Sequence, residues 1–137
     1  MTPTGQTADG RWELGVRRTV ALDRDEAWDV LTSPEGLHTL LGTQDAALEP
    51  GRAYTGTDGL EWQVRSVTPR EVARLSWQPQ GWLRSSTLQI RVIPAATGTT
   101  IAIHHEGLPD AAAREQLLAQ WTAYLDGFIS SAPDLAE

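Results

Sequence analysis

The feature that most constrains this chain is a series of alternating segments followed by one long amphipathic segment. Apolar and polar residues alternate, as in strands with one buried face, over residues 52–57, 60–68, 71–78, 86–94 and 99–106. Turn signals such as Asp58-Gly59 and the stretch around Gly98 separate these segments. The pattern predicts an antiparallel meander whose sheet has one dry face and one wet face.

A dry sheet face needs a cover, and the last part of the chain can supply it. The stretch "AAAREQLLAQWTAYLDGFIS" follows Asp110, a residue suited to cap a helix N-terminus. Its large apolar residues fall on one side at helical spacing: Leu117, Trp121, Tyr124, Leu125 and Phe128. We therefore expect a long C-terminal helix that covers the dry face of the sheet.

The N-terminal part adds one strand and two short helices. Residues 12–22 alternate as a strand, after which Asp23 and Glu26 form a capping-box pattern at the start of a helical stretch. Ser33-Pro34 ends this helix and begins another, and Gly42 suits its exit. The predicted fold class is α+β, organised as a flexible N-terminal arm (1–10), a single domain (11–132) and a C-terminal tail (133–137).

Composition excludes several classes of function. The chain has 137 residues, enough for one core, with a formal net charge of −7 and a pI near 4.9. Nucleic acids and anionic membranes require a basic surface, so neither is an expected partner. No apolar run reaches the ~20 residues that a bilayer span needs, and the N-terminus lacks a signal-peptide pattern. We expect a cytoplasmic protein.

Two residue types that carry much of enzyme chemistry are missing. There is no cysteine, which excludes disulfides, thiolate metal sites and thiol nucleophiles. All 11 basic residues are arginine, which excludes Schiff-base chemistry on lysine. We expect no cofactor.

The tandem pair His104-His105 resembles a metal site but is unsuited to be one. Successive strand residues point to opposite faces, so these two side chains cannot converge on one ion. The remaining histidine, His38, belongs to a distant predicted helix, and we expect no metal site. His105 shares the dry face with Ile101 and Ile103, where it is either a packed, hydrogen-bonded residue or a polar contact for a ligand.

Arg18 also falls in the inward register of its strand. Burying an unpaired guanidinium costs several kcal/mol, so the side chain needs an acceptor or must reach water. Either Arg18 lies near the sheet edge and extends to solvent, or it lines a cavity and holds an anionic or carbonyl-bearing ligand.

Six tryptophans are many for this length. Trp62, Trp77 and Trp121 point toward the space between the sheet and the long helix, where they either fill the core or line a cavity. Trp82 belongs to a loop between strands and is either a lid over a cavity mouth or an ordinary rim residue.

The order of elements and several motifs resemble a known family. The motifs are "VRRTVALDRDEAWDVLTSPEGL", "LEPGRAY", "RLSWQP", "STLQIRVIPAATGTTIAIHHEGLPD" and "QWTAYLDGFI", which together span about residues 12–130. They resemble the heat-shock-protein ATPase-activator-homologue (AHSA-type) family of the START-like, birch-pollen-allergen (SRPBCC) superfamily. The resemblance implies a helix-grip fold, in which a curved antiparallel sheet wraps around a long C-terminal helix. His105 matches the family histidine, whereas Leu40 and Leu41 stand where the family commonly has two tryptophans.

The favoured hypothesis is a binding protein for a hydrophobic or aromatic small molecule, such as a lipid or polyketide-like metabolite. The ligand would lie in a cavity between sheet and helix, with Arg18, Tyr54 or His105 fixing its orientation. The predicted walls are Trp62, Trp77 and Trp121, with Leu40 and Leu41 at the mouth. We expect a monomer or homodimer.

Two alternatives stay open. One is an aromatase/cyclase-type enzyme, in which His105 or Tyr54 acts as acid or base and Arg18 polarises a carbonyl. The other is a protein-interaction or stress-response module that binds through the helix or the Trp82 loop, with its interior filled.

Overall fold

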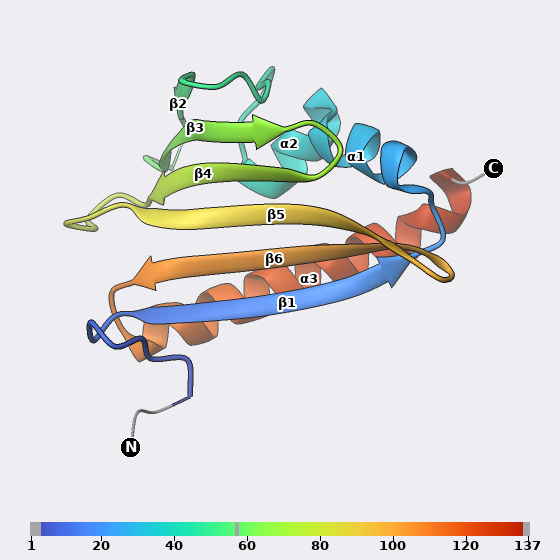
Figure 1. Ribbon diagram of the computed structural model, residues 1–137. Coiled ribbons are helices and arrows are strands. Elements are labelled where there is room, and N and C mark those ends of the chain that lie inside the picture. Colours follow the sequence, from blue (N-terminus) through green and yellow to red (C-terminus); the bar gives the residue numbers. More distant parts are fainter. Residues whose placement is uncertain (1–3, 57, 136–137) are drawn as a thin grey trace.

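The computed structural model describes residues 4–56 and 58–135, with side chains described as far as residue 129. The strands are β1 (Trp12–Val20), β2 (Ala53–Thr55), β3 (Glu61–Thr68), β4 (Val72–Gln78), β5 (Ser86–Ala95) and β6 (Gly98–Leu108) (Figure 1). The helices are α1 (Arg24–Thr32), α2 (Pro34–Leu41) and α3 (Ala111–Leu135). The predicted α+β helix-grip fold is confirmed, including the two short helices after the first strand.

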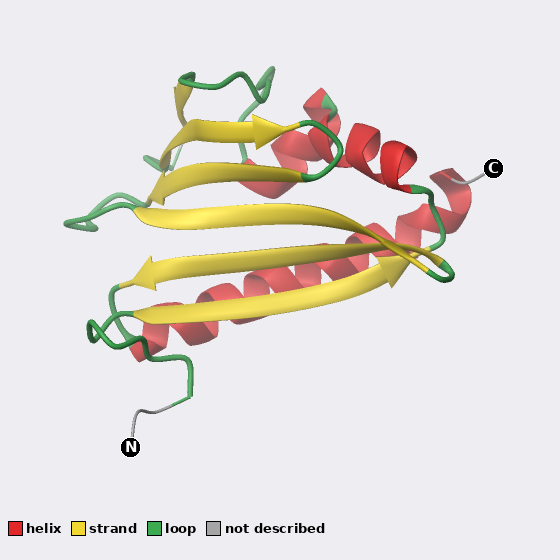
Figure 2. Ribbon diagram, viewed as in Figure 1, coloured by secondary structure: helices red, strands yellow, loops and turns green. Residues whose placement is uncertain are grey.

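The strands form one sheet in the order β1-β6-β5-β4-β3-β2, and every neighbouring pair is antiparallel. The chain thus runs as a meander from β2 to β6, and β6 then pairs with the N-terminal strand. Two register shifts interrupt the ladders, one near Trp12 in β1 and one between Val64 and Ser66 in β3. All three helices lie on one face of the sheet (Figure 2).

The helical layer has two parts that cover different strands. α3 packs along β1 and β6, whereas α1 contacts β5 and β6 and packs on α2 (Figure 1). The dry face of β3 and β4 therefore lies under the space where α2 and the first half of α3 approach each other. This arrangement positions the site described below.

The helix ends are fixed by the predicted capping residues. The Asp23 carboxylate accepts a hydrogen bond from the backbone N–H of Glu26 at 2.8 Å, and Ser33 Oγ accepts one from Gly36 at 3.0 Å. Asp110 accepts one from Ala113 at 2.7 Å at the start of α3. Gly42 ends α2 in the left-handed region, with φ of 73°.

The core lies between the sheet and the helical layer. Residues that alternate along the strands are buried on the helix-facing side, among them Val64, Leu75, Leu88, Ile101 and Ile103. The other face is polar and carries cross-strand pairs such as Arg74 and Gln89, whose side chains bond at 2.9 Å. The predicted dry and wet faces thus correspond to the observed ones.

The segment before β1 folds back on it. The N–H of Glu13 donates to the carbonyl of Gly5 at 2.7 Å, and Gln6 forms an isolated bridge with Trp12. Residues 1–3 of the predicted arm and residues 136–137 of the predicted tail lie outside the described residues, and α3 extends to Leu135. The domain boundaries and the flexibility of the arm stay predictions.

No helix in the described part of the chain combines the length and the hydropathy that a membrane span requires. The cytoplasmic location stays a prediction.

The contact between α1 and α2 depends on Gly36, where a Cβ would lie 2.1 Å from the carbonyl oxygen of Val30. We expect Gly36→Ala to lower the free energy of unfolding by about 1–3 kcal/mol, because neighbouring backbone must shift. The matched control is Gly127→Ala in α3, where a Cβ meets nothing within 4 Å. Because alanine is the better helix former, the control is expected to gain about 0.5–1 kcal/mol. Urea unfolding measures both, and equal effects at the two sites would contradict the steric explanation.

Candidate functional site

Four rings from four separate elements meet between the sheet and α3. Trp77 on β4 contacts His105 on β6 with ring centroids 4.8 Å apart, Trp121 on α3 at 6.1 Å and Trp82 of the β4–β5 loop at 5.6 Å. All three contacts are edge-on, the geometry that aromatic quadrupoles favour. We call these four residues the aromatic cluster.

A chain of hydrogen bonds fixes the inner part of the cluster. Trp121 Nε1–H donates to His105 Nδ1 at 3.1 Å. Because an indole nitrogen can only donate, Nδ1 accepts and the histidine proton is on Nε2. Nε2–H then donates to Ser86 Oγ at 2.7 Å, and the Ser86 hydroxyl donates to the carbonyl oxygen of Trp77 at 2.6 Å. This series of hydrogen bonds links α3, β6, β5 and β4, and each group donates to the next one.

His105 is a neutral residue of the core. It is 0% exposed, and burial lowers its pKa from the ordinary 6.5 to about 3, with a smaller contribution from the nearby His104. Both ring nitrogens are bonded to protein groups. Neither nitrogen is free to exchange a proton with a ligand while this arrangement holds.

A second aromatic pair closes the core next to the cluster. The rings of Tyr54 and Trp62 stack at 4.5 Å, and Trp62 Nε1–H donates to Thr43 Oγ1 at 2.9 Å. The Tyr54 hydroxyl donates to the carbonyl of Ala47 and accepts from its N–H, at 3.2 and 3.0 Å. The pair therefore anchors the connection between α2 and β2 to the sheet.

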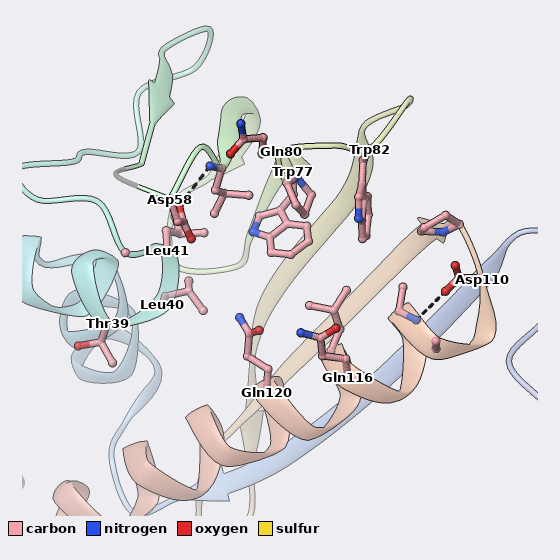
Figure 3. Close-up of a pocket in the computed structure, with 17 residues that line it drawn as sticks. Thr39, Leu40, Leu41, Asp58, Trp77, Gln80, Trp82, Asp110, Gln116 and Gln120 are labelled. Atoms are coloured by element: carbon pink, nitrogen blue, oxygen red, sulfur yellow. Dashed lines mark hydrogen bonds between the residues drawn. The ribbon is translucent and has the colours of Figure 1, made fainter.

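An open groove of about 660 Å³ lies beside the aromatic cluster, between α2, the β4–β5 loop and the first half of α3 (Figure 3). Trp77 on β4 forms its floor, Leu60 also lines it, and Trp82 of the β4–β5 loop stands in its wall (Figure 3). Besides these three, the described residues that line it are Thr39, Leu40, Leu41, Gly42, Asp58, Pro79, Gln80, Pro109, Asp110, Ala112, Ala113, Gln116, Leu117 and Gln120.

The polar groups of the groove differ in how they are bonded. Asp58 accepts from the N–H of Leu60 at 3.1 Å, and Asp110 caps α3, so both carboxylates already hold backbone donors. Gln116 and Gln120 are exposed, and their amides extend from α3 toward Trp77 (Figure 3). The indole N–H of Trp77 is buried and has no hydrogen-bond partner among the described residues.

The groove brings together some of the predicted site residues. Leu40, Leu41 and Trp77 line it, and so does Trp82, which is partly exposed on the groove wall. Trp62 and Trp121 are 2% and 1% exposed and lie with His105 in the packed interior behind the floor. The space between sheet and helix is thus filled along the middle of α3 and open at its N-terminal end.

Arg18 and Tyr54 do not line the groove. Arg18 Nε lies 3.1 Å from Asp126 Oδ1 on α3, its Nη1 donates to the carbonyl of Arg17, and its side chain is 38% exposed. Of the two alternatives for Arg18, the structure shows the one in which the side chain lies near the sheet edge and reaches solvent. The carboxylate of Asp126, 108 positions later in the chain, holds the guanidinium there. The ring of Tyr54 covers Trp62 from the β2 side.

Sequence reasoning missed the residues that α3 and the turns contribute. Ala113, Gln116, Leu117 and Gln120 recur at helical spacing along one border of the apolar stripe. Small side chains and amides along such a border are the sequence signal that could have indicated a stretch of helix on which no other element packs. Gln80 reaches the groove because its side chain lies over Gly59, which nothing in the local sequence indicates.

Two other features lie away from this groove. A second groove of about 730 Å³ separates α1 and α2 from the second half of α3, where Val30, Tyr124 and Phe128 line it and burial raises the pKa of Tyr124. On the outer face of the sheet, Glu13, His104 and Glu106 bring their ligand atoms within 4.8 Å of one another, and His104 Nε2 lies 3.6 Å from Glu13 Oε2. Such acidic groups are common on surfaces without an ion.

The low pKa of His105 makes stability depend on pH. His105 takes up a proton near pH 6.5 in the unfolded chain but only near pH 3 in the folded protein. The contribution of this histidine to the free energy of unfolding is therefore complete above about pH 6.5 and is lost as the pH falls toward 3. We expect a loss of about 2 kcal/mol between roughly pH 7 and pH 5, measured by urea unfolding. His105→Gln should remove this slope, and His104→Gln on the outer face should keep it. A slope that disappears in the His104 variant instead would contradict the assignment.

Comparison with known proteins places the chain in a family. Residues 21–130 match the family described as Activator of Hsp90 ATPase homolog 1-like protein. A search of the curated proteins finds no match.

Solved structures share the fold at low sequence identity. DynU16, a protein of the dynemicin biosynthetic locus, superposes with a TM-score of 0.75 at 21% identity over 87% of this chain, which spans only 46% of that protein. An AHSA1-like protein from Rhizobium etli gives 0.70 at 24% identity over 93% of this chain and 86% of its own. The Aha1 dimer from Colwellia psychrerythraea gives 0.73 at 10% identity over 88% and 95%. The fold and the family match agree, and the chain belongs to the Activator of Hsp90 ATPase homolog 1-like family.

Proposed function

We propose that this protein binds a small, largely apolar aromatic molecule in the groove between α2, the β4–β5 loop and α3. The observation that carries the proposal is the groove itself, about 660 Å³ with Trp77 in its floor and Trp82 in its wall. Ligand sites of small molecules commonly have volumes of ~300–1,000 Å³ and aromatic linings with a few polar groups.

The charges of the groove favour a neutral or cationic ligand. Asp58 and Asp110 are the charged residues among the described residues that line it, and both are acidic. The chain as a whole carries a net charge of −7. A carboxylate or phosphate entering the groove would meet like charges without an arginine to compensate them.

The bonding of the inner residues favours binding over catalysis. The cyclase hypothesis assigned the role of acid or base to His105 or Tyr54. His105, however, is buried with both ring nitrogens hydrogen-bonded, and the Tyr54 hydroxyl is hydrogen-bonded to the backbone of Ala47. The two carboxylates of the groove hold backbone N–H groups. A rigid floor with its polar atoms already engaged suits a receptor for a ligand.

The relatives support a ligand from specialised metabolism. DynU16, which shares the fold, is a protein of the dynemicin biosynthetic locus. All residues of the groove belong to one chain, so binding would require a single copy, whether the protein is a monomer or a dimer like Aha1 from Colwellia psychrerythraea.

The proposal is tested by filling the groove from α3. Gln116 points into the groove (Figure 3), whereas Glu115, its neighbour on the helix, does not line the groove and lies in a separate shallow hollow beside Leu118. Nile red, a neutral aromatic dye, is titrated into the wild type, Gln116→Phe and Glu115→Phe, with its emission as the readout. We expect saturable binding that Gln116→Phe weakens about tenfold or more, equivalent to about 1.4 kcal/mol.

The control variant separates a blocked groove from a general surface effect. Glu115→Phe adds the same ring to the same helix and should leave the affinity within about twofold of wild type. Equal weakening by both variants, or no saturable binding to the wild type, would contradict a ligand site in this groove.

A further inference from the structure

Four tryptophans are buried, and three of them, Trp62, Trp77 and Trp121, lie between the sheet and α3 with different partners for their indole N–H groups. Trp62 donates to Thr43, and Trp121 donates to His105. Trp77 is only 6% exposed, yet its N–H has no partner among the described residues. A buried donor without an acceptor costs free energy, and native structures contain few of them.

The unpaired donor lies at the groove. Trp77 belongs to the groove floor, and its indole nitrogen points toward the side where Leu40 and Leu41 of α2 lie (Figure 3). The ring also packs edge-on with His105 and Trp121, so the indole cannot turn its N–H to another acceptor without disturbing the aromatic cluster. The donor is therefore fixed in position and directed at the α2 wall.

We infer that the groove selects ligands that carry a neutral hydrogen-bond acceptor on a planar ring system, and that Trp77 Nε1–H binds this acceptor. The inference rests on the proposed function and deepens it by naming the class of ligand. An indole only donates, so the ligand must supply the acceptor. Asp58 and Asp110 disfavour a carboxylate in the same groove, which leaves an uncharged oxygen such as a ring ketone.

Entry of the acceptor requires a small movement of the α2 wall. The Trp77 nitrogen is buried by neighbouring side chains. Leu40 and Leu41, which are 5% and 3% exposed, stand on the side that it faces, so one of them must change rotamer to admit an acceptor (Figure 3). A ring ketone lying between α2 and Trp77 would take the place of a leucine methyl group and supply the missing bond. Its planar body would then lie between Leu41 and the Gln116 and Gln120 amides of α3.

The test compares two planar molecules that differ in one carbonyl group. Fluorenone carries a ketone, and fluorene has the same tricyclic frame without an acceptor. Both are titrated into the full chain, with proton–nitrogen correlation NMR of the six tryptophan indole groups as the readout. The Trp77 resonance is assigned from the wild-type protein by nuclear Overhauser contacts and checked by its loss in Trp77→Phe.

We expect fluorenone to bind about tenfold more tightly than fluorene, the effect of one buried hydrogen bond. Fluorenone should move the Trp77 indole proton downfield, and fluorene should not. In Trp77→Phe, which keeps a ring in the floor but lacks the donor, the affinity ratio should fall to about one. Trp12→Phe, which makes the same change in β1 at a tryptophan that does not line the groove, should preserve the ratio.

Each outcome bears on a different statement. Equal affinities for fluorenone and fluorene, with the Trp77 resonance unmoved, would overturn the acceptor preference and leave ligand binding in the groove intact. Absence of binding by either compound, together with absence of Nile red binding, would overturn the proposed function and this inference with it. Fluorenone carboxylate binding more tightly than fluorenone would overturn the neutral-acceptor class. The wild-type NMR result stands even if Trp77→Phe fails to fold.

Discussion

The hydrogen bond from Trp121 to His105 joins the two layers of this fold, and much of the interior is arranged around it. α3 contributes the indole, β6 the imidazole, and the bond is buried on all sides. Because the indole can only donate, the bond sets the histidine tautomer. In this tautomer His105 donates to Ser86, and the Ser86 hydroxyl donates to the Trp77 carbonyl. The position of the groove floor thus follows from a contact between helix and sheet.

The groove exists because the helical layer covers the sheet unevenly. α3 lies over β1 and β6 and α1 over β5 and β6, so no helix packs closely on β3 and β4, and large side chains fill the space above these two strands. Trp62 and Trp77, which pair across these two strands, supply that cover. At the start of α3 the side chains facing the floor are short, with Ala112 and Ala113 among them, and a volume remains that the rings do not fill.

The elements could be predicted from sequence because each rests on local chemistry. Alternation gave the strands of the meander, and Asp23, Ser33 and Asp110 marked helix starts that their observed capping bonds explain. Site residues depend on contacts between distant segments, and there the sequence was less informative. Arg18 was assigned to the inward register of β1, but whether it faced a cavity or the rim depended on Asp126, a residue of the last helix.

The interior volume was likewise beyond sequence reasoning. Trp62, Trp77 and Trp121 all point to the dry face, as predicted, yet the pattern cannot distinguish a ring that fills the core from one that borders a space. Trp62 and Trp121 fill it, since each contacts other rings and donates to a partner within the protein. Leu40 and Leu41 reach the groove because α2 ends above β4, a placement fixed by packing of the whole layer.

The difference among the indoles of Trp62, Trp77 and Trp121 bears most directly on the proposed function. The donors of Trp62 and Trp121 stabilise the fold by bonding to Thr43 and His105, whereas the buried donor of Trp77 contributes a cost of about 1–3 kcal/mol until an acceptor meets it. A phenylalanine there would avoid that cost and still pack against His105 and Trp82. The proposed ligand would account for the tryptophan, because an acceptor that it carries would supply the missing hydrogen bond.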